Sequence, residues 1–69
     1  MSSNRDVREY QVTGKMSRDA YEINLYRGPH EETAQYYLGL AKKKYPVCRF
    51  YRNFVNGTRS YNEYRSEGK

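Results

Sequence analysis

The segment GPHEETAQYYLGLAKKKYP, residues 28–46, is the stretch of this sequence that predicts its fold. Apolar side chains recur in it at steps of three and four, as on one stripe of an α-helix. The members of this stripe are Ala34, Tyr37, Leu38, Ala41 and Tyr45. Pro29 suits the first turn of a helix, because its missing N–H would have no partner there. Pro46 then ends the helix, since the residue before a proline is disfavoured in helical conformation.

Two segments with alternating polarity precede this helix. Val7–Thr13 (VREYQVT) alternates and ends at Gly14, and Tyr21–Tyr26 (YEINLY) alternates more regularly. The residues expected on the inward face of the second segment are Tyr21, Ile23 and Leu25. Alternation of this kind is typical of half-buried strands. Because the connection between the segments is short and polar, we expect an antiparallel hairpin.

A third strand is expected after the helix. Val47–Val55 (VCRFYRNFV) is rich in β-branched and aromatic residues, which favour strands. Alternation places Cys48 and Phe50 on the inward face, opposite Arg49 and Tyr51. The cysteine is therefore expected to be a buried, unreactive thiol.

The chain is expected to return in a second hairpin. Asn56-Gly57 is the strongest short signal for a two-residue turn, so Thr58–Arg65 should run back antiparallel. That register places Arg52 opposite Tyr61 and Phe54 opposite Arg59. The chain of 69 residues has room for one small core. We therefore predict a single α+β domain over residues 7–65, with a small antiparallel sheet, one packed helix and the order β-β-α-β-β. Residues 1–6 and 66–69 are expected to be flexible ends.

Positive charge is concentrated in the second half of the chain. Residues 1–32 carry a net charge of −1 and residues 33–69 a net charge of +6, and no acidic residue lies between Thr33 and Asn62. A one-sided positive field attracts polyanions before close contact forms, and nucleic acid is the usual polyanion. A basic face can also serve only to keep a protein soluble. The interleaved tyrosines and a pI near 9.5 favour nucleic acid.

Two groups of residues are candidates for contact with RNA. The three successive lysines at the end of the helix could hold phosphates, although lysine is also favoured there by the helix dipole. Arg49 and Tyr51 could bind phosphates and stack on bases if their strand face is exposed, or could simply cover that face. The candidate nucleic-acid-binding residues are Lys42, Lys43, Lys44, Arg49, Tyr51, Arg52, Arg59 and Tyr61.

The sequence offers little for catalysis. His30 is expected to be solvated at the helix start, and Cys48 has no base nearby in sequence to make it a nucleophile. One cysteine and one histidine cannot form a zinc site, and no glycine-rich phosphate loop occurs. We therefore expect a binding protein that is not an enzyme and has no metal, cofactor or small-molecule substrate.

The cellular location of the protein is predicted from its apolar segments and its cysteine content. No apolar run approaches the roughly 18 residues of a membrane span, and residues 1–6 contain no apolar segment of a signal peptide. A single cysteine excludes an internal disulfide and favours a reducing compartment. We expect a cytoplasmic protein without a membrane partner.

The run REYQVTGK, residues 8–15, resembles the opening strand of the large-subunit ribosomal protein family that includes archaeal LX and its longer eukaryotic counterpart. That family shares a Glu/Lys-Tyr-x-Val-x-Gly-Arg/Lys run, then a second strand, a helix rich in aromatic and basic residues, and another strand. Residues 56–58 and 63–65 also resemble a hairpin of the eukaryotic form, where it belongs to a second module. The resemblance implies an rRNA-bound structural protein without catalysis. It maps the basic residues of that family onto Lys15, Lys42, Lys43, Lys44 and Arg59.

Three non-catalytic functions remain in competition. The leading hypothesis is an RNA-binding structural protein within a ribonucleoprotein such as the ribosome. The second is a small adaptor or inhibitor of the phage type, which binds a host protein complex through a strand edge or a Tyr/Arg-rich face. The third is an assembly linker of the kind found in antenna complexes, but the chain lacks the Gly-Gly-Lys-Ile-like strand of those linkers.

Overall fold

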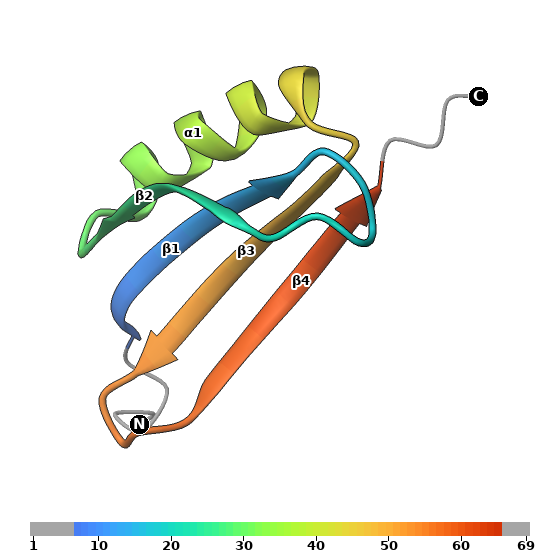
Figure 1. Cartoon of the computed structure of the whole chain (residues 1–69). Helices are drawn as coiled ribbons and strands as arrows, with labels where there is room; N and C mark the ends of the chain where they lie inside the picture. Colours follow the sequence, from blue (N-terminus) through green and yellow to red (C-terminus); the bar gives the residue numbers. More distant parts are fainter. Residues whose placement is uncertain (1–6, 66–69) are drawn as a thin grey trace.

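A four-stranded antiparallel sheet carries one helix across one of its faces (Figure 1). This computed structural model describes residues 7–65, so the ends expected to be flexible lie outside the described residues. The elements are β1 (Val7–Lys15), β2 (Ile23–Gly28), α1 (Glu31–Lys44), β3 (Val47–Phe54) and β4 (Arg59–Arg65). The spatial order of the strands is β2-β1-β3-β4, and every pairing is antiparallel. The predicted α+β class and element order are confirmed.

The helix follows the predicted stripe closely. Ala34, Leu38, Ala41 and Tyr45 are buried and Tyr37 is half-buried. The helix ends at the predicted position, where the Tyr45 N–H donates to the carbonyl of Ala41 at 2.7 Å. At the other end, Pro29 precedes the N-cap residue His30 and does not lie in the first turn.

The core lies between α1 and the two central strands. Val12 of β1 and Cys48 and Phe50 of β3 are almost fully buried beneath the helix. The expected inward placement of Cys48 and Phe50 is therefore confirmed. Aromatic rings extend this core at its margin, because the Tyr26 and Tyr37 rings stack with centroids 5.3 Å apart.

A glycine allows the end of the helix to pack against the end of β1. The ring of Tyr45 lies so close to Gly14 that a Cβ on Gly14 would be 2.5 Å from Cδ2 of Tyr45. Only glycine permits this approach. Gly14 therefore belongs inside β1, and the expectation that the strand ends there is wrong, since β1 continues to Lys15.

The second strand differs from the prediction in its start and in the face it presents. It begins at Ile23, and Tyr21, expected inward, is 84% exposed in the connection before it. A bulge lies where Val12 pairs with Tyr26 and Thr13 with Asn24. The extra residue, Leu25, changes the alternation, so Ile23 is exposed while Leu25 and Tyr26 both contact the core.

The hairpin between β3 and β4 has a three-residue loop. The Gly57 N–H donates to the Phe54 carbonyl and the Phe54 N–H donates to the Thr58 carbonyl, both at 2.9 Å. Gly57 has φ +96°, as expected for a glycine that closes a three-residue loop. The predicted two-residue turn is therefore wrong.

This loop shifts the predicted register by one residue. Tyr61 lies opposite Tyr51, Arg52 opposite Ser60, and Arg59 opposite Asn53. The predicted pairs Arg52–Tyr61 and Phe54–Arg59 are wrong. The observed register is favoured because it pairs Tyr64 with Cys48 on the core face.

We expect Gly14→Ala to lower the free energy of unfolding by about 1–3 kcal/mol, because the new methyl group would overlap the buried Tyr45 ring. Gly39→Ala is the matched control, since a Cβ at this helical position meets nothing within 4 Å. This control substitution should stabilise the protein by up to about 1 kcal/mol. Urea denaturation of dilute protein measures both values, and equal stability of the two variants would contradict this account.

Candidate nucleic-acid interface

The ends of α1, β1 and β4 and the start of β3 lie at the same end of the domain (Figure 1). Each of these elements has basic residues there. In the sheet, Val47 pairs with Lys15 on one side and with Arg65 on the other. The three lysines of α1 lie immediately before β3 in the chain. We call this group the basic end. Its members are Lys15, Lys42, Lys43, Lys44 and Arg65.

Two of these lysines lie over aromatic rings. The Nζ atom of Lys42 is 4.3 Å from the centroid of the Tyr64 ring, and that of Lys44 is 5.5 Å from the centroid of Tyr45. Contacts of this kind favour one position for a flexible ammonium group. They place the two lysines on different sides of the helix end.

A shallow groove of about 440 Å³ opens beside Lys42, between Tyr45, Tyr64 and Arg65. Cys48 lines its floor, where the thiol donates to the Tyr45 carbonyl at 3.6 Å. Burial raises the pKa of this thiol, although the charge of Lys42 opposes the shift. Glu63 also lines the groove and binds Arg65 at 2.8 Å, so Lys42 is the lining cation that makes no salt bridge within residues 7–65. The groove is therefore lined by cations, rings, a neutral thiol and one ion-paired carboxylate.

The helix-free face of the sheet carries a network of ion pairs around Arg49. The guanidinium donates to Glu22 at 2.9 Å and to Glu63 at 3.0 Å. It also donates to the Tyr51 hydroxyl at 3.2 Å, and this bond, followed by the bond to Glu63, raises the pKa of Arg49 above its usual range. Two carboxylates thus neutralise the arginine that was expected to hold a phosphate.

Tyr51 lies within this network and is 6% exposed. Its hydroxyl donates to Glu22 at 2.6 Å. Its ring is covered by the Arg59 guanidinium, 4.3 Å from the ring centroid, and by the Tyr61 ring at 5.1 Å. Burial also raises the pKa of the Tyr51 phenol. Tyr51 therefore helps to cover the sheet, and the ring open to a base on this face is that of Tyr61, which is 51% exposed.

Arg52 lies on the other face of β3 from Arg49 and Tyr51. Its guanidinium is 4.9 Å from the centroid of the Phe50 ring and donates to the Asn62 side chain at 3.2 Å. The candidate residues therefore fall into three places. The lysines are at the basic end, Arg52 is on the helix side, and the helix-free face holds Arg49, Tyr51, Arg59 and Tyr61.

Sequence reasoning did not identify Arg65 and Tyr64 as site residues. Both belong to the site because of the pairing of β4 with β3, which places Tyr64 beside Cys48 and Arg65 beside Val47. In the sequence, only their position at the end of the last strand points to this site. Placing them beside Cys48 and Val47 requires the correct register of the β3–β4 hairpin.

A second groove, of about 470 Å³, lies on the helix-free face near the β3–β4 loop. Its lining includes three arginines: Arg8, Arg27 and Arg59. The carboxylate of Glu9 also lines it, and it accepts hydrogen bonds from Arg27 at 2.8 Å and from Asn53 at 3.4 Å. Glu9 in this groove and Glu63 beside Arg65 at the basic end each satisfy part of the local positive charge. The three lysines of α1 make no salt bridge within residues 7–65, so the basic end is better suited to phosphate.

Residues 7–65 contain no group of three or more His, Cys, Asp and Glu side chains placed to hold a metal ion. The one helix of this region is also too short and too polar to cross a membrane. No family model matches the sequence, and comparisons with curated proteins and with solved structures return no match. The resemblance to the LX family stays a prediction.

We expect Tyr51→Phe to lower the free energy of unfolding by about 1–2 kcal/mol, because it removes the hydroxyl that binds Glu22 and Arg49. Tyr51→Ala should cost about 3–5 kcal/mol, since it also removes a buried ring. Tyr21→Phe is the control, because this exposed tyrosine makes no such contact. Urea denaturation tests all three variants, and a Tyr51→Phe protein as stable as the wild type would contradict the network.

The hydrogen bonds from Arg65 and then Arg49 lower the pKa of Glu63. A carboxyl with a lowered folded-state pKa stabilises the protein at pH values above its unfolded-state pKa, which is about 4.3. This stabilisation is lost as the pH falls through the folded-state pKa. We therefore expect Glu63→Gln to be less stable than the wild type at pH 6 and the difference to shrink toward pH 3. Asp19→Asn, in the β1–β2 connection, is the control. A constant difference across this range would contradict the assignment.

Proposed function

We propose that this protein binds RNA through phosphate contacts at the basic end and serves as a non-catalytic structural component of a ribonucleoprotein. The observation that supports this proposal is the convergence of cations around Val47. The sheet register brings Lys15 and Arg65 to either side of this residue, and α1 ends just before it with three lysines. Clustered cations of this kind supply most of the affinity for a phosphate backbone.

RNA fits this surface better than duplex DNA. Duplex DNA is commonly read by a helix lying in the major groove. The one helix of residues 7–65 begins with Glu31 and Glu32, whose charges would oppose a phosphate backbone along its length. A single strand can instead bind across the end of the domain, with its phosphates on the lysines. The free thiol of Cys48 suits a reducing compartment such as the cytoplasm.

The salt dependence of binding tests the proposal. If four or five cations of the basic end bind phosphates of single-stranded RNA, log K should fall against log salt with a slope of about −3. Lys42→Ala combined with Lys44→Ala should weaken binding of every RNA sequence and reduce the slope by about 1.4. The matched control combines Arg8→Ala with Arg27→Ala, which removes two charges from the groove near the β3–β4 loop. A flat salt response, or equal losses in the two double variants, would contradict the proposed site.

A protein-binding adaptor is the second candidate, because β4 is an edge strand whose residues are largely exposed. Such an edge can accept a strand from another protein. A pull-down from lysate with and without nuclease separates the candidates. A partner lost after nuclease treatment supports RNA binding, and a partner that is retained supports the adaptor.

A further inference from the structure

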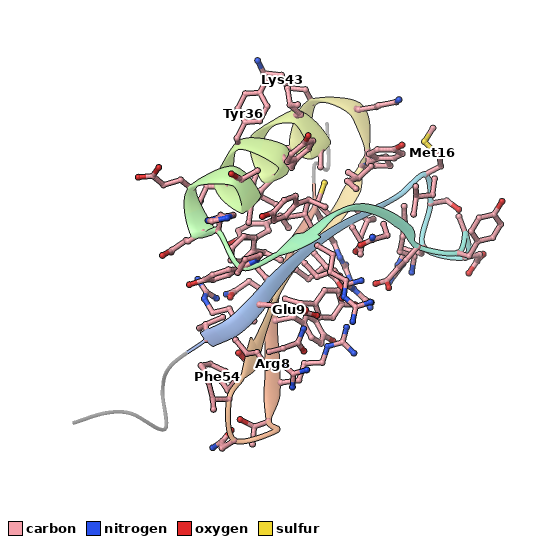
Figure 2. All side chains as sticks on the ribbon, turned by 90° about the vertical axis from the view of Figure 1, so that its left-hand side faces the viewer. Arg8, Glu9, Met16, Tyr36, Lys43 and Phe54 are labelled. Carbon is pink, nitrogen blue, oxygen red and sulfur yellow. The ribbon has the colours of Figure 1, made fainter. Side chains whose placement is uncertain are left out.

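The side of α1 that faces away from the sheet carries an ordered stripe. Glu32, Tyr36, Gly39 and Lys43 follow one another at steps of four, three and four, which is the spacing of one line along a helix. All four residues are exposed, and Tyr36 is 64% exposed. Figure 2 shows Tyr36 and Lys43 projecting from the same outer side of α1. Leu40, also exposed, flanks this outer stripe.

Gly39 has no role within the described part of the chain that requires a glycine. It lies in the middle of α1, where glycine costs about 1 kcal/mol relative to alanine. A Cβ at this position would have nothing within 4 Å. Positive φ does not explain it either, because among the described glycines only Gly57 has one. What the missing side chain does provide is space on the outer surface for the close approach of another molecule.

The outer stripe is complementary to itself when its direction is reversed. Its order is acid, aromatic ring, glycine, base. If a second copy of α1 lies antiparallel on the first, Glu32 of each copy meets Lys43 of the other. Tyr36 of each copy then lies over Gly39 of the other, where no side chain obstructs the ring. Such an arrangement has two-fold symmetry, the commonest symmetry of protein dimers.

We propose that this surface binds a second copy of the same chain, with the two α1 helices antiparallel. Charge complementarity favours this occupant, because a parallel arrangement would oppose Glu32 to Glu32 and Lys43 to Lys43. Antiparallel helices also bring opposite ends of their dipoles together.

The proposed dimer leaves most of the basic end free. Lys42 and Lys44 lie to either side of the outer stripe, over Tyr64 and Tyr45. Two 14-residue helices are only about 21 Å long, so the interface is small and the dimer should depend on protein concentration. The two basic ends would then lie at opposite ends of the helix pair, as two separate sites for RNA.

Sedimentation equilibrium of the nuclease-treated full chain, without added RNA, tests this inference independently of the proposed function. We expect a monomer–dimer equilibrium with a dissociation constant between about 10 μM and 1 mM. Tyr36→Ala should raise the dissociation constant at least about tenfold. Gly39→Ala should do the same while raising the thermal stability of the dilute monomer. Gly39→Ala should thus weaken the dimer but stabilise the monomer, so partial unfolding of the variant could not produce the same result. Val55→Ser, an exposed apolar position in the β3–β4 loop, should leave the equilibrium unchanged.

Charge exchange gives the sharper test. Glu32→Lys and Lys43→Glu should each be monomeric alone, because each places like charges opposite one another. An equimolar mixture of the two variants should associate, since every pair in the mixed dimer is then complementary. Circular dichroism confirms that each variant is folded. The inference is overturned if the wild type stays monomeric to about 1 mM, if Gly39→Ala associates as strongly as the wild type, or if the mixture of folded variants stays monomeric.

Discussion

The packing of α1 against β1 and β3 is the interaction on which the rest of this structure depends. Val12, Leu38 and Phe50 form its centre, and the contact of Tyr45 with Gly14 fixes the end of the helix against the end of β1. One helix can cover only one face of a four-stranded sheet. The other face must therefore be covered by the side chains of the sheet itself, in a chain that has few aliphatic residues and nine tyrosines.

The helix-free face meets this requirement with polar contacts. Tyr51 is buried there beneath Arg59 and Tyr61, and its hydroxyl binds Glu22, which also binds Arg49. An acid from the first half of the chain, Glu22, thus helps to neutralise an arginine from the second half. The two halves of the sequence differ in charge, but in the folded domain this separation is only partial. The excess positive charge lies mainly at the basic end.

The parts of the fold that depend on local patterns could be predicted from the sequence. The stripe of α1, the inward face of β3 and the order of the elements follow from periodicity over a few residues. The registers could not be predicted, because they depend on the extra residue at Leu25 and on a three-residue loop closed by Gly57. The same distinction holds for the site. Three successive lysines are visible in the sequence, whereas the place of Arg65 and the burial of Tyr51 depend on partners far along the chain.

The pairing of β1 with β3 has a consequence for the order of folding. These central strands are joined from Lys15–Val47 to Val7–Phe54, with β2 and α1 between them in the chain. Contacts so distant in sequence form slowly, because a long loop must close first. During synthesis, β1, β2 and α1 all leave the ribosome before the strand that completes their core. Until Phe50 emerges, Val12 and Leu38 lack one of the side chains that bury them in the folded domain, and the domain gains its full stability only when its second half has been made.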